Sequence, residues 1–224
     1  MKAGNRVYSS PDDLPAVIPV FPLPAALLLP RADMPLNIFE PRYLAMVEAA
    51  MAGKRIIGMI QPRDTDEGNS HPALAEVGCA GRITSYSETE DNRYLITLSG
   101  IARFRIVEER NTSTPFRQTS VDYAAYAGDL NLSASEPTIA RERLIGALKT
   151  YLASRNMQTD WQSVKDAPAE MLVNALSTMC PFAPAEKQAL LEAADIAKRA
   201  DVLIALIEMA NASAKIPTSG NPLN

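Results

Sequence analysis

Histidine, cysteine and tryptophan are nearly absent from this chain of 224 residues, which contains one His, two Cys and one Trp. A site built from several His or Cys ligands is therefore excluded, and we predict no metal-binding residue. His71 stands in a polar loop, where a solvated side chain is expected in preference to a catalytic pair with Cys79. Cys79 and Cys180 are far apart and are expected to be buried thiols of a cytoplasmic protein.

Phosphate-binding loops are missing as well. The chain has no G-x-x-x-x-G-K-[S/T] segment and no G-x-G-x-x-G segment, and Gly53-Lys54 lacks the upstream glycine. Because such loops cradle nucleotide phosphates, we predict no nucleotide cofactor and no cofactor-binding residue. The acidic residues Asp64, Asp66 and Glu67 lack the terminal Glu of a calcium loop and are expected to be solvated.

A long apolar run and an excess of positive charge are also absent. The longest uncharged stretch, residues 14–30, contains five prolines, which prevent a continuous membrane-spanning helix. The formal net charge is −4, and both halves of the chain are mildly acidic. A dedicated nucleic-acid binder is usually basic, so no nucleic-acid partner and no membrane contact are expected.

The first 130 residues have the alternating pattern of short β-strands, with one early helix. The helix is predicted to begin at Pro41 and to end at Gly53, and residues 62–73 are predicted to form a loop. Gly78 and Gly81 lie inside a strand, where a bulge is expected. Predicted strands cover Ile18–Phe21, Leu27–Leu29, Leu36–Phe39, Arg55–Ile60, Leu74–Ser87, Arg93–Leu98, Arg103–Ile106 and Val121–Tyr126, with a break at Gly100. Such short strands with glycine corners favour a small closed barrel.

The apolar period changes to that of helices after Gly128. One helix is predicted from Pro137 to about Ser154, followed by a polar connector over residues 155–166. A second helix is predicted from Pro168 to Cys180, and residues 183–210 are expected to form one bent helix or two. The predicted division is therefore a barrel over residues 1–130, a helical part over 131–213 and a flexible tail over 214–224.

Arg103 and Arg105 share one face of a predicted strand. Two arginines in that arrangement can contact phosphates. Glu108 and Glu109 follow closely, so cross-strand ion pairs are the favoured interpretation.

Several segments carry a family resemblance through their order and spacing: Ile18–Leu23, Leu28–Pro30, Met34–Leu36, Ile38–Tyr43, Glu76–Ile83, Ser99–Ile106 and Pro184–Glu192. Together they resemble the amino-terminal domain of the Lon ATP-dependent proteases over residues 17–212. The resemblance implies an α+β fold, with a PUA-like β-barrel followed by an α-helical bundle. Lon proteases continue into an ATPase and a Ser-Lys peptidase domain, which this sequence lacks, so it resembles stand-alone bacterial members. No catalytic residue can be transferred, and we expect no enzyme activity.

The role implied by the resemblance is a non-enzymatic module that binds unfolded or partner polypeptide. We assign the peptide-binding lining to Leu28, Met34, Tyr86 and Tyr94, which are apolar or aromatic. The alternative that remains open is a PUA-like protein that binds RNA or a small ligand. The acidic charge predicts RNA binding no tighter than about 10⁻⁴ M. A weak homo-oligomer also remains open.

Overall fold

The computed structural model describes residues 1–63, 71–131 and 137–214. The chain divides into two compact units. Unit 1 contains residues 1–134 and 183–192, and unit 2 contains residues 135–182 and 193–224. The predicted loop at 62–73 and the predicted tail therefore fall mostly outside the described residues.

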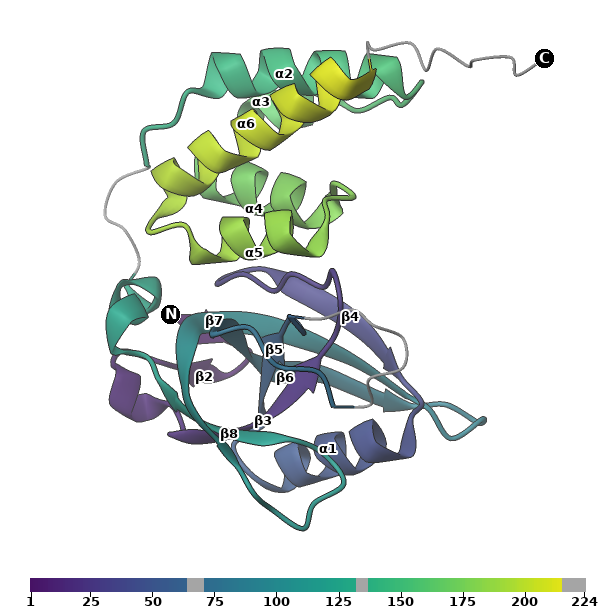
Figure 1. Cartoon of the computed structure of the whole chain (residues 1–224), viewed down its shortest axis with the longest axis vertical. Coiled ribbons are helices and arrows are strands. Elements are labelled where there is room, and N and C mark those ends of the chain that lie inside the picture. The colour runs from purple at the N-terminus through teal and green to yellow at the C-terminus, as the bar shows by residue number, and fades with distance from the viewer. Residues whose placement is uncertain (64–70, 132–136, 215–224) are drawn as a thin grey trace, which may run out of the picture. The chain divides into compact units, whose positions relative to one another are not determined.

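Unit 1 is built around strands that pair in a closed ring (Figure 1). The pairing runs from β7 through β6, β5, β3 and β8 and returns to β7, so the small barrel predicted from the sequence is present. A sixth strand, β4, pairs only with β7. The bounds are β3 Val17–Pro22, β4 Asp33–Ile38, β5 Ile56–Ile60, β6 Val77–Glu88, β7 Tyr94–Arg110 and β8 Gln118–Asp122. All pairs are antiparallel except β3 with β5.

Smaller elements complete unit 1. Helix α1 (Pro41–Ala52) packs on β3 and β5 and begins and ends as predicted. Helix α5 (Pro184–Glu192) packs on β6. The remaining elements are β1 Lys2–Ala3, β2 Arg6–Val7 and the 3₁₀ helices η1 Pro11–Asp13 and η2 Ala124–Leu130. The ring encloses a core that includes Ile18, Val20, Ile101 and Phe104.

Unit 2 is helical. Helix α6 (Ile196–Ala214) contacts both α2 (Arg141–Ser154) and α4 (Ala169–Met179), as Figure 1 shows. The predicted stripe on α2 is buried at Leu144, Leu148 and Tyr151. Where a polar connector was predicted, Trp161–Asp166 forms the short helix α3, which Asp160 caps by accepting the Gln162 amide. Residues 183–210 form two helices rather than one.

Three strand predictions differ from the structure near Gly100. Leu27–Leu29 is not a strand but a buried segment that lies against Gly81 and Gly100. The Leu29 carbonyl lies so close to Gly100 that any Cβ there would overlap it. Glycine therefore admits this close approach, and β7 continues through Gly100 instead of breaking. The bulge predicted at Gly81 is confirmed by a register shift between Ala80 and Gly81.

The position of α5 is the main difference in domain organisation. The sequence placed residues 184–192 in the helical part because their apolar period is helical. In the structure α5 belongs to unit 1, although the segments on either side of it belong to unit 2. Periodicity identifies a helix but does not specify which surface the helix covers.

Candidate functional site

One face of β4, β6 and β7 gathers most of the residues predicted to bind peptide. In the β4–β7 register Met34 lies opposite Leu98 and Leu36 lies opposite Ile96, which also lies opposite Tyr86 of β6. Directly opposed residues point to the same face of an antiparallel sheet, and residues two apart on a strand share it, so Tyr94 belongs to this face too. We call the half-exposed residues Met34, Leu36, Tyr86 and Tyr94 the tyrosine face.

The centre of this face is buried and its rim is not. Ile38, Ile96 and Leu98 are at most 3% exposed. The rings of Tyr86 and Tyr94 lie 5.1 Å apart at an interplanar angle of 58°. The result is an apolar and aromatic surface whose base is rigid and whose rim is open to solvent.

Two glutamates hold the tyrosine hydroxyls. The Tyr86 hydroxyl donates to Glu88 at 2.7 Å, and the Tyr94 hydroxyl donates to Glu48 of α1 at 2.8 Å. The pKa of Tyr86 is raised, first by desolvation and then by its bond to Glu88. The pKa of Tyr94 is raised mainly by its bond to Glu48. Both hydroxyls therefore stay protonated at neutral pH, and both tyrosines remain fixed donors beside carboxylates.

Leu28 does not join the other three predicted residues. It is 2% exposed, and its side chain lies against Gly81 and Gly100 in the interior of unit 1. Its apolar character therefore reflects core packing, and Leu28 is not part of a binding surface. Phe39, which the sequence analysis did not select, is 61% exposed, and the guanidinium of Arg93 lies 5.8 Å from its ring centroid.

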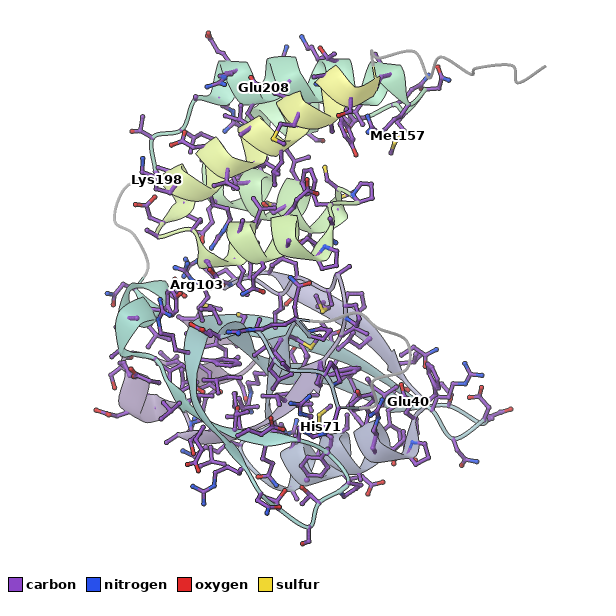
Figure 2. All side chains as sticks on the ribbon, viewed as in Figure 1. Glu40, His71, Arg103, Met157, Lys198 and Glu208 are labelled. Atoms are coloured by element: carbon purple, nitrogen blue, oxygen red, sulfur yellow. The ribbon has the colours of Figure 1, made fainter. Side chains whose placement is uncertain are left out.

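A second constellation, which we call the α5 anchor, joins α5 to the ring through Arg103, Asp129, Gln61, Lys187 and Gln188. Arg103, which is labelled in Figure 2, is 3% exposed. It donates from Nε and Nη2 to the two Asp129 carboxylate oxygens, each at 2.8 Å. Its Nη1 donates to the Leu191 carbonyl of α5 at 3.1 Å. Burial alone would lower the pKa of Arg103, but Asp129 more than offsets this, and the pKa is raised.

The other members of the α5 anchor bind backbone groups. Gln61 accepts the Ala25 amide and donates to the Pro184 carbonyl at 2.9 Å. Lys187 donates to the Ala25 carbonyl at 2.8 Å, and Gln188 donates to the Val77 carbonyl at 3.0 Å. These bonds satisfy buried polar groups, so their role is to position α5.

The less favoured alternative, in which Arg103 contacts phosphates, is therefore excluded by the burial of its side chain. The favoured ion-pair interpretation holds, but the partner is Asp129 rather than Glu108 or Glu109. Arg105 lies 3.9 Å from Glu76. A buried ion pair between distant residues leaves no local sequence signal, which is why sequence reasoning missed Asp129.

Among the described residues, His71 and Cys79 do not form the catalytic pair that was considered from the sequence. His71 Nε2 lies 3.2 Å from Glu109, which also receives two hydrogen bonds from Arg117. Cys79 is buried. Asp64, Asp66 and Glu67 lie outside the described residues. Within the described residues there is no group of three or more potential metal-ligating side chains and no helix long and apolar enough to cross a membrane.

Unit 2 has exposed methionines. Among its described residues the large exposed apolar side chains are Met157, Met171, Met179 and Met209. Met171 and Met179 lie two helical turns apart on α4, with exposed Ala175 between them. They form a second exposed apolar strip, which lies on one side of α4.

Comparison with known proteins decides the family. Residues 17–209 match the family model described as the ATP-dependent protease La (LON) substrate-binding domain. The chain belongs to this family. It is 23% identical over 211 residues to a Lon protease of Dictyoglomus thermophilum, and 26% identical over 215 residues to Lon protease 2 of Sorangium cellulosum. These alignments cover 87% and 91% of the chain but only 24% and 26% of the relatives, so the chain spans about a quarter of their length.

Two solved structures share the fold. A Lon N-terminal domain protein from Xanthomonas campestris superposes with a TM-score of 0.58 at 22% identity, covering 84% of this chain and 97% of that one. The N-terminal domain of a Mycobacterium avium complex Lon protease gives 0.60 at 18% identity, covering 86% and 98%. The matches lie in the N-terminal, substrate-binding region of Lon and confirm the α+β fold.

Proposed function

We propose that this member of the Lon substrate-binding family binds unfolded, apolar polypeptide without catalysing a reaction, and that the tyrosine face is its binding surface. The observation that carries the proposal is the gathering of Met34, Leu36, Tyr86 and Tyr94 on one half-exposed face. Methionine adapts to guests of different shape, and tyrosine offers large contact area at low entropic cost.

The charges at the tyrosine face favour polypeptide over RNA. Aromatic rings can stack nucleic-acid bases, but only where the surrounding charge attracts phosphates. Here Glu48 and Glu88 accept the two tyrosine hydroxyls and repel a phosphate backbone. The buried Arg103 is held by Asp129 and is not part of a positive surface. RNA binding is therefore expected to be no tighter than about 10⁻⁴ M, the weak end of non-specific association.

The test is a titration with a labelled, reduced, unfolded protein and with labelled RNA, each at two salt concentrations. We expect binding of the unfolded protein in the micromolar to millimolar range, because an extended chain must be ordered on a small surface. Salt should change this affinity little, since apolar burial dominates. Tight, steeply salt-dependent RNA binding without polypeptide binding would overturn the proposal.

A pair of variants locates the surface. Met34→Asp places a charge on the tyrosine face and should weaken polypeptide binding about tenfold, which corresponds to 1.4 kcal/mol. The matched control is Val107→Asp in β7, which should leave polypeptide binding unchanged. Val107 is 67% exposed, lies at a bulge of β7 and is outside the tyrosine face. Binding that survives Met34→Asp but falls with Met179→Asp would move the site to unit 2.

A further inference from the structure

Within the described part of the main sheet, β4 is the one strand that pairs with a single neighbour, so it has no partner along the whole of its outer edge. Every strand of the ring has a neighbour on both sides along at least part of its length. An unpaired edge presents rows of backbone donors and acceptors, and proteins usually protect it. What this edge can bind depends on which residues point outward.

A backbone hydrogen bond fixes the orientation of each β4 residue. The Gly100 amide donates to the Ala32 carbonyl at 2.9 Å, so the adjoining pair of Asp33 and Ser99 is a non-hydrogen-bonded pair. Side chains approach closely in such a pair, and Ser99 Oγ does lie 2.5 Å from Asp33. Because the two kinds of pair alternate, Asp33, Pro35 and Asn37 direct their backbone groups away from β7.

These three outward residues are exposed, and their backbone groups have no hydrogen-bond partner among the residues described. Proline has no backbone N–H. At an outward-facing position such as Pro35 this removes no hydrogen bond between β4 and β7. The edge thus offers two donors, from Asp33 and Asn37, and three carbonyl acceptors. Met34 and Leu36 alternate with them and point to the tyrosine face.

We propose that the free edge of β4 binds an extended segment of foreign polypeptide as an added antiparallel strand. This inference rests on the proposed function and specifies how the polypeptide is held beside the tyrosine face. Main-chain pairing is tolerant of sequence, as a binder of varied unfolded chains requires. Guest residues opposite Met34 and Leu36 point onto the tyrosine face, so segments with an apolar residue at every second position are preferred.

Pro35 favours a foreign strand over a second copy of this chain. Three outward residues can exchange up to six backbone hydrogen bonds with an antiparallel partner. A proline-free guest loses only the bond that Pro35 cannot donate. Two copies paired about Pro35 lose two bonds, because both prolines lack the donor at the same point. The edge is therefore open to guests and partly protected against self-association.

The test compares Asn37→Pro with Asn37→Ala in the full chain, using the labelled, reduced, unfolded protein as the probe. Asn37→Pro removes an outward donor and no bond to β7, and the preceding Leu36 already has the extended conformation that proline requires. Asn37→Ala removes the side chain and keeps the donor. We expect Asn37→Pro to bind about 2- to 10-fold more weakly than Asn37→Ala.

Pro35→Val restores the missing backbone donor at the outer edge of β4. This variant should bind the probe more tightly than the unaltered chain and should self-associate in size-exclusion experiments.

Hydrogen exchange on the unaltered chain gives an independent readout should Asn37→Pro fail to fold. The amides of Asp33 and Asn37 should gain protection when the probe binds, while those of Met34 and Leu36, already bonded to β7, should change little. Equal affinities of the two Asn37 variants, or unchanged exchange at Asp33 and Asn37, would overturn strand addition. If Met34→Asp still weakened binding, the proposed function would stand, whereas absence of all polypeptide binding would overturn both.

Discussion

Strand β7 passes through two environments, one with a half-exposed rim and one completely buried. Its first part, from Tyr94 to Ser99, lies between β4 and β6 with a half-exposed aromatic rim. Its middle part, from Ile101 to Phe104, is completely buried and includes the Arg103 ion pair. In the buried part the charged Arg103 is paired with Asp129, while the open part carries half-exposed aromatic groups on the face that we propose binds polypeptide.

We expect this difference to separate substitutions that lower the stability of the fold from those that weaken the proposed polypeptide binding. In the buried part an unpaired charge cannot reach water, so removing a partner is costly. At the half-exposed rim of the open part water replaces a lost contact, so a substitution there should change stability little and, under the proposed function, weaken polypeptide binding. The predictions below test this division from the largest effect to the smallest.

A fragment that ends at residue 131 should fail to fold, although it contains the whole ring. It lacks α5, whose Leu190 and Leu191 are buried and whose Leu191 carbonyl accepts Arg103. The ring would expose that apolar surface and leave the polar groups of the α5 anchor without partners. We expect aggregation or no cooperative transition by circular dichroism. A soluble fragment with a sharp thermal transition would show that α5 is dispensable.

Asp129→Ala should lower the free energy of unfolding by about 3–5 kcal/mol, because it leaves the Arg103 charge buried without its partner. The matched control is Glu208→Ala, which breaks the solvent-exposed pair with Arg143 and should change stability little. Urea denaturation of both variants measures the two changes in the free energy of unfolding. Similar behaviour of the two variants would mean that burial does not distinguish these ion pairs.

Gly100→Ala should cost about 1–3 kcal/mol, since the new methyl group meets the Leu29 carbonyl across the sheet. Gly128→Ala provides the control, because a Cβ at Gly128 meets no atom within 4 Å. Thermal unfolding of the two variants measures the difference. A Gly100→Ala protein as stable as the control would show that the Leu27–Leu29 segment can move away without cost.

Glu109, at the exposed end of β7, should make a small contribution that depends on pH. Its bonds from Arg117 hold the pKa of the carboxyl below 4.5 in the folded state. The resulting stability is present above about pH 4.5 and is lost as the pH falls through the lowered folded-state pKa. The free energy of unfolding should therefore fall less steeply between about pH 5 and 3 in Glu109→Gln than in the unaltered chain. Parallel slopes would contradict this assignment.

Local pattern was sufficient for much of the fold. Helix α1 follows from Pro41, its apolar spacing and Gly53, and the helices after Gly128 follow from their period. The alternation in β4 and the bulge at Gly81 were also readable, because side-chain burial repeats along each element in a simple way. Three of four predicted binding residues, Met34, Tyr86 and Tyr94, lie together, since aromatic and methionine side chains at strand ends are often half-exposed.

The sequence by itself determined most of the strands and helices, although not the course of Leu27–Leu29, the continuity of β7 through Gly100 or helix α3, and it placed a proline in β4 where a backbone donor is missing. Only the tertiary structure decided that the ring closes without β4, that Arg103 pairs with Asp129, and that α5 belongs to unit 1. Leu28 shows the same limit, because apolar character alone does not separate core from surface. The physical reason is that periodicity reports which side of an element is apolar, whereas pairing between distant segments depends on packing that no local pattern records.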